Sequence, residues 1–283
     1  MKLIRLLQIV FWKLHSRILC RNNSLQNIHK GEKCYIIGNG ASLKYIDYEA
    51  LPKFKAIGTT YLLLDERIKF IDLKYYIIPD TYTYYKLCYT PRLKKITKNY
   101  REIFFKRFIK NNKNINFFTH LSNFYAFFKN PNNVNFYYDK EFTILKNKKK
   151  LNTFNLTHSL HSPLNGSLDI MITVAKFLGF REVILLGCDY LSDPPLQGHF
   201  YSNTDPFIEN AINEEYENRI REVSHGLDVT IILPKDSKSN IFKYKSIEEF
   251  IGKQSRCKKN SEFINRKDID LLEIASTNKQ LYM

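Results

Sequence analysis

The stretch NGSLDIMITVAKFLGFREVILLGCDY (165–190) decides the fold of this chain. Apolar residues follow helical spacing over Leu168–Leu178, and Gly179 then predicts a helix end with a left-handed cap. The apolar run in REVILLGCDY (181–190) follows at once and predicts a buried strand that stops at Gly187–Tyr190. Because a helix followed directly by a buried strand is half of a βαβ unit, the chain is predicted to be an α/β protein.

Similar patterns on both sides extend this unit. Strands are predicted at the end of 31–37, at Lys55–Thr59, at Leu73–Ile78 and at Val229–Leu233, and a charged helix is predicted over 205–224. Alternating strands and helices indicate one Rossmann-like, mostly parallel sheet flanked by helices. Residues 81–150, rich in Tyr, Phe, Lys and Asn, show no clear pattern.

The five cysteines are scattered, odd in number and form no CxxC pair, which argues against a disulfide framework and a structural zinc site. Cys34 and Cys188 fall within strand-like runs and are expected in the core.

The 283-residue chain is strongly basic, with a formal net charge of +16. Such a charge attracts nucleic acid, anionic membranes or anionic substrates. A joint excess of Lys, Asn, Ile, Phe and Tyr also arises in genomes poor in G and C, so the origin of the charge stays open. The basic, aromatic stretch 92–113 is more typical of a solvated helix face than of a stacking platform for bases, and no nucleic-acid partner is expected.

Residues 1–21 are expected to form a basic amphipathic helix. The longest apolar run is Ile9–Trp12, far short of the ~20 residues that span a bilayer, and basic residues recur throughout, unlike a signal peptide. Such a helix is expected to lie on an anionic membrane surface, which implies a cytoplasmic protein that is peripheral on the inner face of the membrane. Docking on the domain and assembly into a homo-oligomer are the alternatives.

The expected organisation is a helical segment at 1–30, a catalytic domain at 31–250 with a lid at about 191–212, and a polar tail at 251–283. In a parallel sheet, ligands bind at the carboxyl ends of the strands. Polar groups are predicted at such ends in Gly38–Ser42, Pro79–Thr81 and Gly187–Tyr190, and Asn165–Ser167 adds a helix start. These segments are expected to converge on one site.

The first of these segments, YIIGNGASL (35–43), predicts a glycine turn that feeds a helix, with Asn39 or Ser42 as the cap. Glycines let the backbone approach a phosphate closely, and free N–H groups at a helix start favour anions. The turn lacks the Lys of a P-loop, and Leu43 stands where a dinucleotide fingerprint has its third glycine. A purely structural turn is the alternative.

The segment ILLGCDYLSDPPLQGHFYSNTD (184–205) contains the candidate catalytic residues. Asp189 ends a strand, and His199 follows in a loop. A loop histidine near the end of a strand is placed where a general base is useful, although an ordinary surface histidine is the commoner case.

Three motifs in this order resemble the bacterial sialyltransferases of Campylobacter type. They are YIIGNGASLKYIDYEALP (35–52), NGSLDIMITVAKFLGFREVILLGCDY (165–190) and GHFYSNTD (198–205), and with their connecting strands they cover roughly residues 31–235. The chain also looks like the wider group typified by motility accessory factors and archaeal MptE-like pyrophosphokinases.

The sialyltransferase resemblance implies a GT-A-variant fold with a small lid. It implies a glycosyltransferase that moves a sialic-acid-like nonulosonate from a CMP donor to a surface glycan or glycolipid, such as lipooligosaccharide or capsule. The implied mechanism is inverting and needs no metal or other cofactor beyond the nucleotide sugar.

The resemblance also implies residue roles. His199 is the general base, and Tyr201 donates to the leaving phosphate. The nucleotide-binding candidates are Gly38, Asn39, Gly40, Ser42, Thr60, Asp80, Asn165, Gly166, Ser167, Asp189 and Tyr190. The chain departs from the family pattern at Thr60, Ser162, Asn165 and Leu191, where the family has Asn, Arg, Ser and Tyr.

Two other functions stay open. An MptE-like diphosphotransferase needs Mg²⁺ and several carboxylates, for which Asp80 and Asp189 are candidates. A non-catalytic nucleotide-binding protein on the same scaffold would not need His199.

Overall fold

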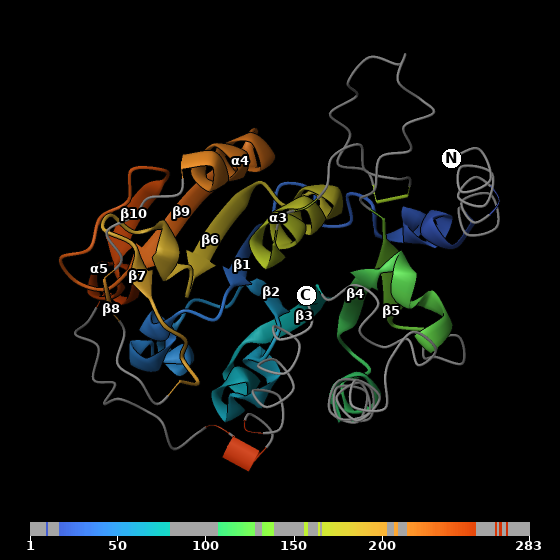
Figure 1. Ribbon diagram of the computed structural model, residues 1–283, viewed down its shortest axis with the longest axis horizontal. Helices are drawn as coiled ribbons and strands as arrows, with labels where there is room; N and C mark the ends of the chain where they lie inside the picture. Colours follow the sequence, from blue (N-terminus) through green and yellow to red (C-terminus); the bar gives the residue numbers. More distant parts are fainter. Residues whose placement is uncertain are drawn as a thin grey trace, which may run out of the picture.

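The computed structural model describes residues 10, 17–79, 107–127, 132–138, 156–157, 164, 166–202, 207–208, 214–252, 264, 266–267 and 270. Eight parallel strands form one sheet at the centre of the molecule (Figure 1). They are β1 (Lys33–Ile37), β2 (Lys55–Thr59), β3 (Asp72–Ile78), β4 (Asn116–His120), β5 (Val134–Tyr137), β6 (Glu182–Leu186), β9 (Asp228–Leu233) and β10 (Lys243–Ser246). The predicted α/β class with a mostly parallel sheet is confirmed.

The remaining elements whose bounds lie within the described ranges are three α-helices, a set of short 3₁₀ helices and a small hairpin. The α-helices are α3 (Ser167–Leu178), α4 (Glu214–Ser224) and α5 (Ile247–Ile251). The 3₁₀ helices are η1 (Cys20–Leu25), η2 (Ala41–Tyr45), η3 (Tyr48–Ala50), η4 (Leu62–Leu64), η5 (Glu66–Phe70), η8 (Leu121–Phe127) and η10 (Asp189–Leu191). The hairpin pairs β7 (Leu196–Gln197) with β8 (Phe207–Ile208).

The strand order is β10-β9-β6-β1-β2-β3-β4-β5. The chain therefore runs from β1 outward to β5, and then returns to the other side of β1 to form β6, β9 and β10. The order reverses between β1 and β6, and a ligand crevice is expected at the carboxyl ends of two strands related in this way.

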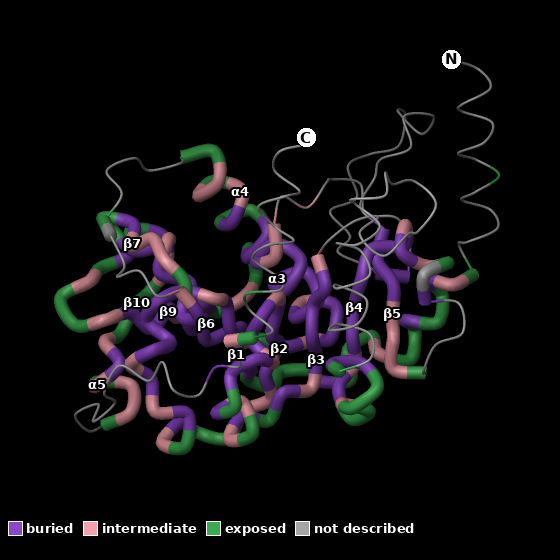
Figure 2. Tube along the Cα trace, turned by 60° about the horizontal axis from the view of Figure 1, so that its bottom comes forward, coloured by how far each residue is buried: buried purple, intermediate pink, exposed green. Residues whose placement is uncertain are grey.

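Side chains of β1 alternate between the two faces of the sheet, as the pleat of a strand requires. Cys34 and Ile36 pack into a core with α3 and α4, whereas Tyr35 and Ile37 pack against the 3₁₀ helices and α5 on the other face. Figure 2 shows the buried strands between these two layers. Cys34 and Cys188 are buried free thiols, as predicted, and burial raises the pKa of both.

Most of the predicted elements are found. The strands at 31–37, 55–59, 73–78 and 229–233 are confirmed, as is the helix that ends at Gly179 with a φ of 90°. The helix predicted over 205–224 is wrong at Phe207 and Ile208, because their backbone pairs with β7 as a strand. Strands β4 and β5 lie in the region 81–150, for which no strand or helix was predicted.

The amino-terminal segment also differs from expectation. The helical segment expected over 1–30 ends at Leu25. The following turn binds the end of α3, with the Asn27 N–H donating to the Phe177 carbonyl at 3.0 Å and the Gly31 N–H donating to the Gly179 carbonyl at 2.9 Å. No helix among the described residues is long and apolar enough to cross a bilayer.

Candidate functional site

The glycine turn after β1 is bound to the end of β6. The Gly38 N–H donates to the Leu186 carbonyl and the Gly40 N–H donates to the Gly187 carbonyl, both at 2.8 Å. The 3₁₀ helix η2 then begins at Ala41. The prediction of a side-chain cap is wrong, because Gly40 occupies the cap position and neither Asn39 nor Ser42 caps the helix.

The two glycines of this turn are required by the close approach of β6. A Cβ atom at Gly38 would lie 2.4 Å from the Gly187 carbonyl oxygen, and one at Gly40 would lie 2.5 Å from Oδ2 of Asp189. Gly40 has a φ of −63°, which any residue adopts, so space and not backbone conformation selects glycine there. The structural role of the turn is therefore present whether or not a phosphate binds.

Asp189 is the carboxylate that meets this turn. Its Oδ2 accepts the Ser42 N–H at 2.7 Å and its Oδ1 accepts the Ser42 hydroxyl at 2.5 Å, and the side chain is buried. Burial raises the pKa of Asp189 to about 6, and the two bonds from Ser42 oppose that rise. Asp189 and Ser42 thus bind one another and lock β6 to the glycine turn.

The candidate catalytic loop, residues 198–202, lies directly beside the glycine turn. His199 forms an isolated antiparallel bridge with Gly40, and the Phe200 N–H donates to the Asn39 carbonyl at 3.0 Å. This backbone pairing brings residues about 160 positions apart in the sequence to the carboxyl end of β1. The structure therefore joins the first and third sequence motifs at the predicted edge of the sheet.

Two cations hold the backbone of the same loop. The Lys44 ammonium donates to the Ser202 carbonyl at 2.9 Å, and the Arg266 guanidinium donates to the Tyr201 carbonyl at 2.5 Å. Two residues before Arg266, the buried Ile264 forms a backbone bridge with Asp65. The segment predicted as a polar tail thus reaches the site, and sequence reasoning missed Arg266 because no pattern in that segment marks it.

The aromatic rings of the loop form a short stack. The His199 ring stacks on Tyr201, with 4.9 Å between centroids and an interplanar angle of 13°, and Tyr201 meets Tyr61 edge-on, also at 4.9 Å. Tyr201 and Tyr61 are buried, whereas His199 is exposed. The imidazole is therefore accessible at the surface and backed by aromatic rings.

Thr60 follows β2 and carries a rare backbone conformation. Its φ is 54°, in the left-handed region that a β-branched residue seldom occupies. The Tyr76 hydroxyl donates to the Thr60 carbonyl at 2.7 Å and holds this conformation in place. Residues held in such conformations cluster at functional sites.

A second group of predicted residues lies around the start of α3. Gly166 is the cap residue of this helix and Ser167 its first residue. The Tyr190 hydroxyl lies 3.3 Å from the Tyr216 hydroxyl on α4, so Tyr190 faces α4 while its neighbour Asp189 faces the glycine turn. Burial raises the pKa of Tyr190.

The predicted single site is therefore realised in part. The structure brings Gly38, Asn39, Gly40, Ser42, Asp189, His199 and Tyr201 together at one place. The contacts of Tyr190 belong to the α3–α4 face, and Asp80 and Asn165 lie outside the described residues. Within the described ranges, no group of three or more His, Cys, Asp or Glu side chains has the arrangement of a metal site.

No model of a known protein family matches the chain, and no curated protein matches it. Among solved structures it is similar to the sialyltransferase CST-II in complex with a trisaccharide acceptor and CMP, with a TM-score of 0.44 and 15% identity over 75% of this chain and 86% of that chain. It is also similar to the monofunctional alpha-2,3-sialyltransferase Cst-I from Campylobacter jejuni, with a TM-score of 0.44 and 14% identity over 89% of this chain and 96% of that chain. Both TM-scores are 0.44 and the identities are 15% and 14%, so the function is argued from this chain's own residues.

Proposed function

We propose that this chain is a glycosyltransferase that uses a nucleotide sugar, with His199 as the general base. The observation that carries the proposal is the backbone pairing of Phe200 with Asn39, which sets the exposed imidazole of His199 beside the glycine turn. The carboxyl ends of β1 and β6 lie at the reversal of strand order, which is where α/β proteins bind ligands.

The side chain of Asn39 is an argument for nucleotide binding at this turn. Its side-chain oxygen is buried and accepts no hydrogen bond from the described residues. A buried acceptor left without a donor costs about 1–3 kcal/mol, so a ligand that brings an N–H or O–H group would be favoured there. An exocyclic amine or a ribose hydroxyl of a nucleotide offers such a donor.

The proposed reaction is a single inverting displacement. A ring nitrogen of His199 takes the proton of an acceptor hydroxyl while that oxygen forms a bond to the anomeric carbon of the sugar. The bond from the anomeric carbon to the phosphate oxygen breaks, and the nucleotide leaves with the electron pair. Arg266 and Lys44, which hold the loop backbone, add positive charge near this position and favour an anionic leaving group.

The order of the three motifs supports a finer proposal. A CMP-linked, sialic-acid-like nonulosonate is the proposed donor, and a surface glycan or glycolipid is the proposed acceptor. Thr60 and Leu191 differ from the family pattern, so the nucleotide is the part of the donor that most needs direct measurement.

A membrane-held acceptor would agree with the basic segment 1–21. We propose that this segment binds anionic lipid on the cytoplasmic face, and the described Arg17 and Arg21 are exposed. Co-sedimentation with phosphatidylglycerol vesicles tests this. Binding that weakens in a variant with neutral residues at Lys2, Arg5, Lys13, Arg17 and Arg21 supports the proposal, and equal binding opposes it.

The diphosphotransferase alternative receives less support. It needs carboxylates that are open to Mg²⁺, and Asp189 instead accepts two hydrogen bonds from Ser42 in a buried position.

A calorimetric screen of CMP, CDP, UDP and GDP, each with and without Mg²⁺, tests the proposal. Binding of a cytidine nucleotide without Mg²⁺, weakened in Asn39→Ala and unchanged in the exposed control Asn23→Ala, supports it. Binding that requires Mg²⁺ or prefers a purine favours the diphosphotransferase. No nucleotide binding at all would remove the proposal's basis.

A further inference from the structure

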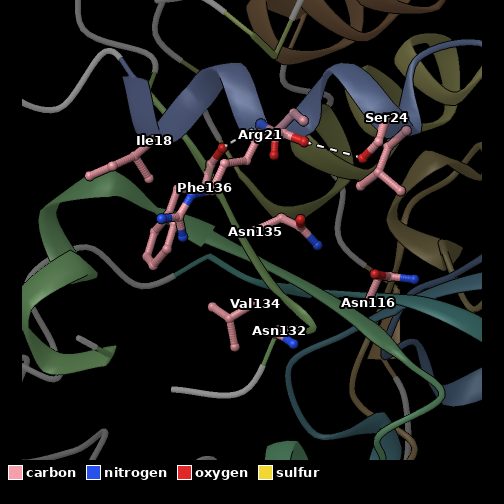
Figure 3. Close-up of a pocket in the computed structure, with 10 residues that line it drawn as sticks. Ile18, Arg21, Ser24, Asn116, Asn132, Val134, Asn135 and Phe136 are labelled. Carbon is pink, nitrogen blue, oxygen red and sulfur yellow. Dashed lines mark hydrogen bonds between the residues drawn. The ribbon is translucent and has the colours of Figure 1, made fainter. Parts of the chain in front are cut away.

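A polar cavity of about 450 Å³ lies between η1 and the strands β4 and β5 (Figure 3). Its volume is within the range of about 300–1,000 Å³ that small-molecule pockets occupy. Six polar side chains of the described part of the chain line it, and they come from both walls: Arg21, Asn22, Ser24, Asn116, Asn132 and Asn135. Most ligand pockets are lined chiefly by apolar groups, so this lining indicates a hydrophilic ligand.

The cavity lies at a different edge of the sheet from the candidate catalytic site. Asn116 is the first residue of β4, and Val134 is the first residue of β5. Both strands run parallel to β1, so these residues mark the amino ends of the strands, whereas the glycine turn and His199 lie at the carboxyl ends. A ligand here would therefore be held apart from the reacting atoms.

One wall of the cavity is fixed before any ligand binds. The Asn22 amide donates to the Phe136 and Leu156 carbonyls, both at 2.8 Å, and Asn22 is 1% exposed. Because β5 is the last strand of the sheet among the described residues, Asn22 also satisfies a carbonyl that no further described strand pairs. η1 is thus attached to β5 by a buried side chain that forms part of the cavity wall.

Several polar groups of the lining have no partner among the described residues. The side-chain oxygen of Asn22 is buried and accepts no hydrogen bond. The side chains of Arg21, Asn116 and Asn132 make no hydrogen bond or ion pair within the described ranges. The site therefore offers unused donors of Arg21 on one wall and unused donors and acceptors of Asn116 and Asn132 on the other.

The chemistry of these groups selects the ligand class. Among the described residues that line the cavity none carries a carboxylate, which does not suit a cation, and Arg21 alone supplies a guanidinium, which is little charge for a phosphate. Carboxamides present both donors and acceptors, which matches hydroxyl groups that also do both. Ile18 and Val134 add apolar surface for the C–H face of a sugar ring. We propose that this cavity is a non-catalytic binding site for a short neutral saccharide.

The proposal does not depend on the activity proposed above, and binding alone tests it. Saturation-transfer NMR with lactose as the probe should show weak, saturable binding to the wild-type protein. In the wild type, the side-chain amide signals of ¹⁵N-labelled Asn116 and Asn132 should shift on titration. The full-length variants Asn116→Leu and Asn132→Leu should lower the affinity by about tenfold, because each removes hydrogen bonds to the sugar without breaking one in the protein.

The controls separate this site from the catalytic one. Asn23→Ala changes an exposed carboxamide of η1 outside the cavity, and His199→Ala changes the catalytic loop; neither should alter lactose binding. The proposal is overturned if lactose does not bind, if the amide signals that shift are not those of the cavity, or if both leucine variants bind lactose as well as the wild type does. Should the leucine variants fail to fold, the amide shifts of the wild type still decide between these outcomes.

Discussion

Asp189 accepts both the backbone N–H and the hydroxyl of Ser42, at 2.7 Å and 2.5 Å, and so joins the two strands between which the order of the sheet reverses. The sequence marks both residues as ligand contacts. In the structure they contact each other, and the carboxylate fills the space where Gly40 would otherwise carry a side chain. The edge of the candidate site is thus built by a buried polar pair.

This pair predicts a pH dependence of stability. The pKa of Asp189 rises from 3.8 to about 6 on folding, so the folded protein holds this proton more tightly than the unfolded chain. The contribution of protonated Asp189 to the free energy of unfolding is therefore fully present below about pH 4. It is lost as pH rises through about 6. Relative to Asp189→Asn, the free energy of unfolding of the wild type should fall by about 3 kcal/mol over that interval, since one pKa unit is worth about 1.4 kcal/mol.

Urea unfolding of both proteins from pH 4 to pH 8 measures this difference. Asp72→Asn, which removes an exposed carboxylate on β3, is the matched control variant. If the free energy of unfolding of the wild type rises with pH relative to that of Asp189→Asn, or stays constant, the pKa of Asp189 is not raised on folding.

Gly40→Ala should destabilise the protein through a steric clash with Asp189 and Gly187. The new methyl group would lie 2.5 Å from the Asp189 carboxylate and 2.7 Å from the Gly187 carbonyl, in a backbone conformation that alanine tolerates. Overpacking of this kind typically costs about 1–3 kcal/mol. The free energy of unfolding measures the loss, and a neutral or stabilising substitution would show that β6 does not approach the turn as described.

Thr60→Asn should stabilise the protein by about 1 kcal/mol. Asparagine occupies the left-handed region far more readily than a β-branched residue does, and Thr60 has a φ of 54°. Thr230→Asn, in the regular backbone of β9, is the matched control and should be destabilising. If both changes destabilise equally, the conformation of Thr60 is not strained.

Arg266→Ala should loosen the loop that carries His199. The lost bond is a charged donor to the Tyr201 carbonyl at 2.5 Å, and such bonds are worth about 1.5–3 kcal/mol. The amide of Phe200, which is bonded to Asn39, should then exchange with solvent at least about tenfold faster. Lys267→Ala removes the adjacent exposed cation and should leave this exchange rate unchanged. If both changes speed the exchange equally, the loss of positive charge explains the effect, and the loss of the hydrogen bond to Tyr201 does not.

The fold could be predicted where side-chain burial leaves a periodic pattern. The helix over Leu168–Leu178 and the strand that follows are buried almost throughout. The spacing of their apolar residues in the sequence therefore predicts both elements. Strands β4 and β5 are short, and polar residues such as Asn116, His120 and Asn135 make up part of each of them. Pairing at the edge of the sheet forms these strands, and pairing between distant segments leaves no local pattern in the sequence.

The site could be predicted only to the level of segments. Glycines at 38 and 40 marked the turn, but the same residues serve close packing and phosphate binding, so the sequence could not separate the two roles. Adjacent residues also diverge, since Asp189 contacts Ser42 while Tyr190 contacts Tyr216. Arg266 is beyond prediction, because only the folded chain brings it to Tyr201.

The central claim is that His199 is the general base of sugar transfer, and its most direct test is the transfer rate of His199→Ala. The donor is the nonulosonate linked to the nucleotide that binds in the calorimetric screen, and the acceptors are a panel of short glycans. The account predicts that the variant binds the nucleotide as tightly as wild type while turnover falls by about 10²–10⁴-fold, and that His225→Ala, at an exposed histidine, keeps full activity. A variant that keeps wild-type turnover, or a wild-type protein that transfers no sugar, would contradict it.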